Sequence, residues 1–162
     1  YILMNDTQFF LEVAEAAARQ STCLRRHYGS VIVDSRRHII STGYNANCVG
    51  MPHCNVIGEC PRNSLGIEQY SDYTLCFSVH SEENALIQAG RQANDCILYL
   101  YGYDVVGKKE IIPKPCFMCT KLLLNAGIKK VITRQIIYEP FDLFNSYASE
   151  IYGKYKPTSF DP

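Results

Sequence analysis

Apolar residues recur at helical spacing in four segments of the chain. Residues 5–7 can cap a first helix, and the apolar positions that follow predict a helix over 6–20. Further helices are predicted over 81–89, 115–126 and 141–151. Gly127 follows the third of these, at a position where glycine commonly ends a helix.

Runs rich in β-branched and aromatic residues predict the strands. Residues 29–34 and 38–44 flank a polar turn and indicate an antiparallel hairpin. Strands over 96–101 and 129–133 alternate with helices, which favours right-handed crossovers and parallel neighbours. We therefore expect one domain over 1–162, a three-layer α/β/α sandwich around a mixed sheet of about five strands.

One long segment fits neither pattern. Residues 45–74 show little periodicity, and they contain three cysteines and His53. A loop of about 30 residues is unusual in a compact domain unless it is functional or cross-linked. This segment is therefore expected to be functional or cross-linked.

Composition excludes several classes of partner. Hydrophobic residues make up 47% of the chain, enough for one core, and 16 basic residues balance 16 acidic ones. A neutral chain argues against a nucleic-acid or anionic-membrane surface, although a local basic pocket for a small phosphate remains compatible. No stretch approaches the roughly 20 apolar residues of a membrane span, and the N-terminal residues lack the basic region of a signal peptide. We expect a cytoplasmic protein.

Eight cysteines are many for a chain of this length. A cytosolic protein keeps them reduced, so clusters of cysteine with histidine indicate zinc rather than disulfides. Cys96 is an exception, because it lies within an apolar run and is expected to be a small buried hydrophobic residue.

Cys116 and Cys119 are the strongest candidate metal ligands. They stand three residues apart at a predicted helix start, so their sulfurs converge where exposed amides favour thiolate. A C-x-x-C pair alone is also compatible with redox chemistry, but a thioredoxin-like redox pair is expected early in the chain, after the first strand. Catalytic zinc takes three protein ligands, and His80 can supply the third. Taken alone, His80 would be an ordinary hydrogen-bonded histidine.

Glu82 is the candidate catalytic residue. If His80 binds zinc, a carboxylate two positions on can reach the open coordination position. It can then take a proton from the activated water and return it to the leaving group. Glu83 is the alternative, but it should point elsewhere and can instead stabilise the first turn of the helix.

The combination of H-x-E with P-C-x-x-C is typical of zinc-dependent nucleobase deaminases. The segments that carry a more specific likeness occur in order at 23–33, 43–45, 52–54, 80–85, 115–119 and 125–128. Together they resemble the deoxycytidylate (dCMP) deaminase family of the cytidine deaminase-like superfamily. The likeness is greatest to the bacterial competence-operon-associated and archaeal branch.

The resemblance implies hydrolysis of dCMP to dUMP and ammonia, with water added at C4 while Glu82 protonates N3 and then the departing amine. It also implies that Asn45 contacts the sugar and base, that Tyr138 lies against the substrate, and that Arg26 or Arg25 binds the phosphate. The alternatives are a turn residue for Asn45, a buried ring for Tyr138 and solvated charge for the arginines.

A second, structural zinc is also implied by the resemblance. Cys23, Cys54 and Cys76 match the places from which its ligands come, and Cys60 is the candidate fourth ligand, with His53 as the alternative. Such a site would cross-link the long loop. The alternative is a set of buried free thiols.

The family forms homo-oligomers, so a dimer or hexamer is expected, with a nucleotide as ligand and neither nucleic acid nor membrane as partner. Two departures from the family pattern stand out. Ser81 replaces a more common alanine, a change expected to be tolerated, and residues 46–50 differ from the usual loop. The insert at 101–112 is expected to form a surface hairpin.

Two other functions are compatible with the sequence. One is a different deaminase, acting on dCTP, cytidine, guanine, a pterin or riboflavin precursor, or tRNA adenosine; the neutral charge argues against tRNA. The other is a non-catalytic zinc-binding partner module. Glu82 argues against that module, since a purely structural site has no use for a proton carrier.

Overall fold

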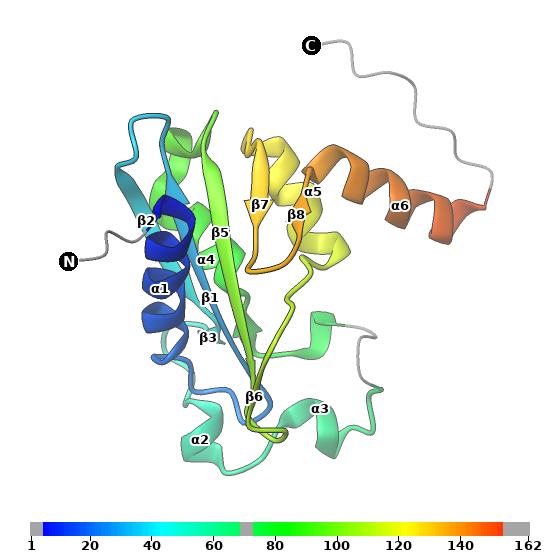
Figure 1. Ribbon diagram of the computed structural model, residues 1–162. Helices are drawn as coiled ribbons and strands as arrows, with labels where there is room; N and C mark the ends of the chain where they lie inside the picture. The colour runs from blue at the N-terminus through cyan, green and yellow to red at the C-terminus, as the bar shows by residue number, and fades with distance from the viewer. Residues whose placement is uncertain (1–4, 69–72, 154–162) are drawn as a thin grey trace.

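The computed structural model describes residues 5–68 and 73–153 (Figure 1). The helices in chain order are α1 (Asp6–Ala18), α2 (Cys54–Ile57), α3 (Pro61–Ser64), α4 (Ser81–Ala89), α5 (Phe117–Asn125) and α6 (Pro140–Tyr152), with 3-10 turns η1 (Tyr73–Leu75) and η2 (Gly90–Ala93). The strands are β1 (Arg26–Val33), β2 (Ile39–Tyr44), β3 (Ala46–Asn47), β4 (Ser78–Val79), β5 (Ile97–Asp104), β6 (Lys109–Ile111), β7 (Lys130–Ile132) and β8 (Ile137–Tyr138). Within the described ranges, no helix has the length and apolar character needed to cross a membrane.

The main sheet is mixed, as predicted. Its order is β2-β1-β5-β7-β8, and β6 pairs with the end of β5. Strand β1 is antiparallel to both β2 and β5, whereas β5 and β7 are parallel and are connected through α5. The sheet has six strands rather than about five because β6 and β8 are short additions.

Helices cover both faces of this sheet, which confirms the three-layer arrangement. Helix α1 lies on one face, and α4 and α5 lie on the other (Figure 1). The alternation of side chains along β1 serves both layers, since Val31 and Val33 pack with α1 while Ile32 packs with Ala85 of α4. The face that carries α4 and α5 is the face on which the candidate site lies.

Several element boundaries differ from the sequence prediction. Strand β1 begins at Arg26 rather than at residue 29, because it pairs with β5 along its whole length. The expected surface hairpin over 101–112 is formed by β5 and β6. The segment 45–74 contains the short helices α2 and α3, and its strand β3 pairs with β4.

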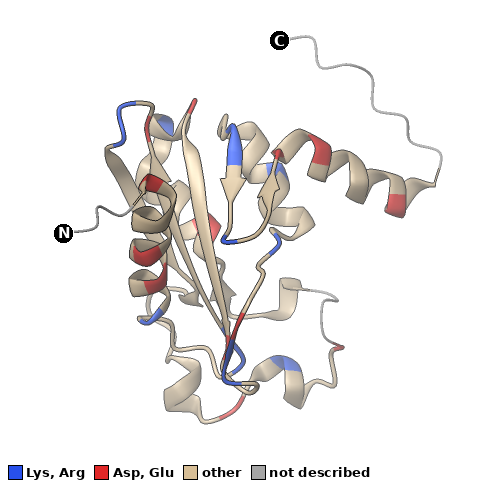
Figure 2. Cartoon of the chain, viewed as in Figure 1, with Lys and Arg blue, Asp and Glu red and all other residues tan. Residues whose placement is uncertain are grey.

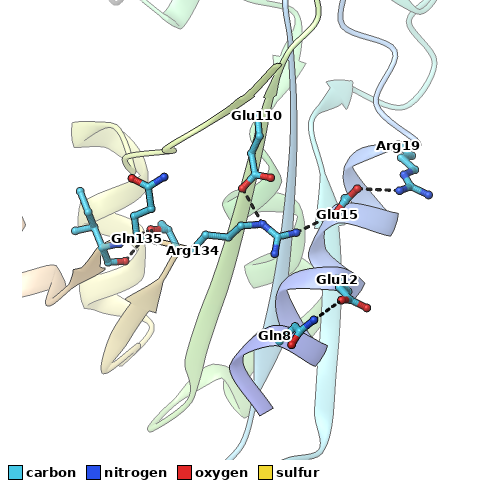
Figure 3. Close-up of polar contacts among 9 residues, drawn as sticks. Gln8, Glu12, Glu15, Arg19, Glu110, Arg134 and Gln135 are labelled. Carbon is cyan, nitrogen blue, oxygen red and sulfur yellow. Dashed lines mark hydrogen bonds and ion pairs between the residues drawn. The ribbon is translucent and has the colours of Figure 1, made fainter. Parts of the chain in front are cut away.

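Arg134, in the turn between β7 and β8, connects that turn to two distant elements (Figure 3). Its Nη2 lies 3.0 Å from Oε2 of Glu15 in α1, and its Nε lies 2.8 Å from Oε1 of Glu110 in β6. The guanidinium therefore joins the β7–β8 turn to α1 and to β6, which pairs with the end of β5.

Candidate active site

The ends of two helices bring the predicted ligands together. His80 is the N-cap residue of α4 and follows β4 directly, while Cys116 is the N-cap of α5. Cys119 lies in the first turn of α5. Because α4 and α5 pack on the same face of the sheet, their N-termini converge on one point.

The three ligand atoms form a compact group. Nδ1 of His80 lies 3.5 Å from the Sγ atom of Cys116 and 3.3 Å from that of Cys119. All three atoms lie within 4.8 Å of one another, and no other such group occurs in the described part of the chain. One imidazole and two thiols fit Zn²⁺, and this number of ligands leaves one coordination position open.

The electrostatics of the group also suit a cation. Hydrogen bonds from Cys119 and His80 stabilise the Cys116 thiolate and lower its pKa to about 4, although burial opposes this. Burial lowers the pKa of His80, but the Cys116 thiolate and the charge of Glu82 outweigh it and raise the pKa to about 9. The bond to that thiolate raises the pKa of Cys119. The protons held on His80 and Cys119 are those that a metal ion must displace.

Glu82 lines the same cavity as His80 and Cys116. Its side chain is buried, with 6% of the residue exposed, and this burial raises the pKa of its carboxyl group. Glu83 has a different task, because its Oε2 accepts the backbone N–H of His80 at 2.8 Å and so caps α4. The structure therefore brings Glu82, and not Glu83, to the wall of the cavity.

The cavity has a volume of about 120 Å³ and is rich in basic side chains. In Figure 2, basic positions mark the start of β1, helix α3 and the segment before α5. Arg26 lines the cavity, but its guanidinium forms an ion pair with Asp104 of β5. Arg25 also lines the cavity, and its side chain has no ion-pair partner within the described residues.

Two further cations of the cavity wall were missed at the sequence level. Arg62 is buried and lies over the ring of Tyr73, with 4.8 Å between its Cζ and the ring centroid, while its Nη2 donates to the Glu68 carbonyl at 2.8 Å. Lys114 immediately precedes the 115–119 motif. Its position next to the predicted metal ligands is the signal in the sequence that could have identified it as a residue of the cavity wall.

Of the predicted substrate contacts Asn45 and Tyr138, only Asn45 lies at the cavity. Asn45 lines the cavity, but its amide is engaged, because Oδ1 accepts the N–H of Tyr28 at 2.7 Å and Nδ2 donates to the carbonyl of Arg26 at 2.9 Å. These two bonds hold the start of β1 in place as one wall of the cavity. Tyr138 lies in β8 against the hydrophobic core and is not among the residues that line the cavity.

The four cysteines of the predicted second site lie in one region but do not form an equally tight group. Cys23, Cys60 and Cys76 line the cavity, whereas Cys54 is buried and bonds to Oδ1 of Asn47 at 3.3 Å. Burial raises the pKa of the Cys54 thiol, and the charges of the other three cysteines raise it further, which reflects their proximity. His53 is exposed, with Nδ1 3.2 Å from Oγ1 of Thr22.

Comparison with known proteins agrees with this geometry. Residues 4–135 match the family model described as the cytidine and deoxycytidylate deaminase zinc-binding region. The chain belongs to this family. A deoxycytidylate deaminase of Mycobacterium phage D29 is 34% identical over 131 residues, which cover 77% of this chain and 91% of the phage protein.

A second relative is the deoxycytidylate deaminase of Schizosaccharomyces pombe, which is 36% identical over 126 residues. The match covers 76% of this chain but only 35% of the yeast protein. The chain thus spans about a third of the length of that relative. The fold is shared with a dCMP deaminase of the cyanophage S-TIM5, solved in complex with dCMP and dUMP. That structure has a TM-score of 0.60 at 20% identity and covers 90% of this chain and 94% of its own.

Proposed function

We propose that this protein is a zinc-dependent deaminase that hydrolyses dCMP to dUMP and ammonia. The observation that carries the proposal is the gathering of His80, Cys116 and Cys119 beside the buried carboxylate of Glu82, in one cavity. A purely structural zinc site would be closed by a fourth protein ligand and would not need a carboxylate with a raised pKa. The family membership and the names of the relatives support the choice of substrate.

The residues have separate tasks in this reaction. His80 and the two cysteines would hold Zn²⁺, which lowers the pKa of bound water towards neutrality. Glu82 accepts a proton from the attacking water and delivers protons to N3 of the cytosine ring and to the departing amine. The C4–N bond breaks, a C4–O bond replaces it, and ammonia leaves. Burial raises the pKa of the Glu82 carboxyl group, which makes the carboxylate a stronger base for the proton of the attacking water.

A substrate panel tests the proposal. Steady-state ammonia release is measured with dCMP, dCTP, CMP and deoxycytidine, each with and without dCTP as a possible effector. We expect the highest kcat/KM for dCMP. Turnover of deoxycytidine without turnover of dCMP would reassign the substrate, and turnover of none by the zinc-loaded protein would favour a binding module.

For the phosphate of the substrate, Arg25 and Lys114 are the candidates supported by the cavity. Arg26 becomes the weaker choice, because its charge is paired with Asp104. Arg25→Ala and Lys114→Ala should each raise the KM for dCMP severalfold and leave the KM for deoxycytidine unchanged. An equal effect on both substrates would contradict phosphate binding.

A second zinc, held by Cys23, Cys54, Cys60 and Cys76, remains part of the proposal. Their proximity supports it, and His53 remains the alternative to Cys60. Metal analysis should give two zinc ions per chain for the unmodified protein and one for Cys54→Ser. The exposed Cys48 provides the control, since Cys48→Ser should keep two. One ion per chain in the unmodified protein would refute the second site.

A homo-oligomer in the cytoplasm completes the proposal. All eight cysteines are free, which suits a reducing compartment. Ile136 and Ile137 are exposed at the outer strand of the sheet, where a second copy could cover them. Light scattering coupled to size exclusion should give the mass of a dimer or hexamer, and a monomer at micromolar concentration would contradict this.

A further inference from the structure

Two buried serine hydroxyls connect the sheet to the catalytic carboxylate. The hydroxyl of Ser30 in β1 donates to Oγ of Ser81 at 2.8 Å, and the Ser81 hydroxyl donates to Oε2 of Glu82 at 2.9 Å. Both serines are completely buried. The carboxylate that lines the cavity is thus held from its far side by a hydrogen-bonded chain that begins in the middle of a strand.

The backbone geometry brings the residues of this hydrogen-bonded chain close together. Ser30 pairs with Gly43 across β1 and β2. A Cβ atom on Gly43 would lie 2.2 Å from the carbonyl oxygen of Ser81, so the first turn of α4 rests directly on the strand backbone. One turn further along α4, the Ser41 hydroxyl donates to the carbonyl of Ala85 at 2.8 Å. The close approach at Gly43 therefore sets the height of α4 where Ser81 and Glu82 lie, while the Ser41 bond lies one turn away from them.

We propose that Ser81 and Ser30 are positioning residues that fix the orientation of the Glu82 carboxylate for proton transfer. A glutamate side chain has three rotatable bonds, and a hydrogen bond to its charged end restricts them. Proton transfer depends steeply on this geometry. The hydroxyl of Ser81, which replaces the more common alanine, therefore has a role rather than being a tolerated change.

The proposal predicts a kinetic pattern and rests on the deaminase function proposed above. Ser81→Ala should lower kcat for dCMP about tenfold, the value of one hydrogen bond to a charged group, with KM within about twofold of the unmodified protein. Ser30→Ala should lower kcat less, about threefold, because Ser81 retains its bond to Glu82. Since the two hydroxyls act in series, the double variant should match Ser81→Ala.

Ser41 provides the matched control. Its hydroxyl is buried on the same face of the sheet and bonds to the same helix, but its partner is a backbone carbonyl instead of a carboxylate. Ser41→Ala should lose stability comparably and keep the unmodified kcat. If Ser81→Ala and Ser30→Ala also keep that kcat, the hydroxyls only dock the helix and the proposal is refuted.

A structural measurement separates this inference from the proposed function. Crystal structures of the zinc-loaded variants should show the Glu82 carboxylate in one conformation in Ser41→Ala and displaced or in two conformations in Ser81→Ala. An unmoved carboxylate in Ser81→Ala would overturn the positioning role even if dCMP is the substrate. If the unmodified protein does not deaminate dCMP, the function fails while the structural result still decides the inference. Should Ser81→Ala not fold, Ser30→Ala provides the same two tests.

Discussion

At the scale of single residues, Glu82 and Glu83 are adjacent carboxylates with different surroundings. Only Glu82 is at the wall of the cavity, and Glu83 caps α4. Glu82→Gln should keep bound zinc and lower kcat by about 10²- to 10⁴-fold, the usual contribution of general acid–base catalysis. Kinetics and metal analysis of the same preparation measure both quantities.

Glu83→Gln is the control for that experiment. Glutamine at this position can still accept the backbone N–H of His80, as it does in capping boxes. Turnover should therefore stay within a few-fold of the unmodified protein. A large loss of kcat in Glu83→Gln with a small loss in Glu82→Gln would reverse the assignment of the two residues.

The binding of zinc should depend on pH through His80 and Cys119. The pKa of His80 is raised to about 9 and that of Cys119 is also raised, so both hold protons at pH 7 in the metal-free site. Zinc requires neutral imidazole and thiolate, so binding at pH 7 should release about two protons. Zinc affinity should rise with pH, and less steeply above about pH 9, where His80 has already lost its proton and only Cys119 still holds one. Calorimetry in buffers of different ionisation enthalpy measures the release, and none at pH 7 would contradict it.

Residue spacing predicted the metal group well but the cavity wall poorly. His80 with Cys116 and Cys119 follows from short motifs, because a helix start fixes where its first side chains point. The partner of Arg26 depends on the register of β1 against β5, where residue 26 meets Asp104. That pairing joins residues far apart in the chain, so local sequence patterns do not reveal it.

At the scale of elements, two glycines allow the helices to approach the sheet closely. A Cβ on Gly43 would meet the Ser81 carbonyl at 2.2 Å, and a Cβ on Gly29 would meet the Ala14 carbonyl at 1.9 Å, on the opposite face. Both Gly43→Ala and Gly29→Ala should destabilise the fold by about 1–3 kcal/mol, the usual cost of overpacking. Denaturant titration measures this cost.

The two variants should differ in activity. Gly43→Ala displaces α4, which carries His80 and Glu82, whereas Gly29→Ala displaces α1, which contributes nothing to the metal group. At a temperature where both remain folded, only Gly43→Ala should lose most of its turnover. Equal losses would mean that α4 is not held by this contact.

The ion pairs of Arg134 should contribute modestly to stability. The side chain is 35% exposed and contacts two carboxylates from different elements (Figure 3), so Arg134→Ala should cost about 1 kcal/mol in free energy of unfolding, and less at high salt. Lys129→Ala removes a more exposed pair with Asp95 and should cost less than about 0.5 kcal/mol. A larger effect for Lys129→Ala would contradict this ranking.

The long periodic elements were predictable, and the short ones were not. Helices α1 and α4 begin within the predicted segments because capping residues and apolar spacing mark them locally. Strands β6 and β8 and helices α2 and α3 have only two to four residues each, too few to establish a period. Strands β6 and β8 form because β5 and β7 provide partners for their backbone hydrogen bonds.

At the scale of the whole molecule, the metal site links two helices whose ligands lie 36 residues apart in sequence. A ligand that binds only the folded state stabilises it by about 2.7 kcal/mol at a hundredfold excess over its Kd. Removing zinc with a chelator should therefore lower Tm by about 5 to 10 °C, and added zinc should restore it. Scanning calorimetry measures the change.

Cys116→Ser distinguishes the two proposed zinc sites in that measurement. It removes a ligand of the catalytic group and leaves the four cysteines of the second site intact. A chelator should then lower its Tm by a smaller, residual amount. No residual effect would indicate that the long loop binds no metal.

The prediction of one domain over 1–162 remains a prediction, which limited proteolysis can test.

The cross-strand pair of Ser30 and Gly43 has a consequence for how this protein can vary. Because α4 rests on this pair, the combined side-chain volume at positions 30, 43 and 81 is close to fixed. A saturation library should accept little beyond glycine, alanine and serine at position 30, and little beyond glycine at position 43. Transplanting the catalytic motif onto another scaffold would therefore require this strand pair as well as the metal ligands.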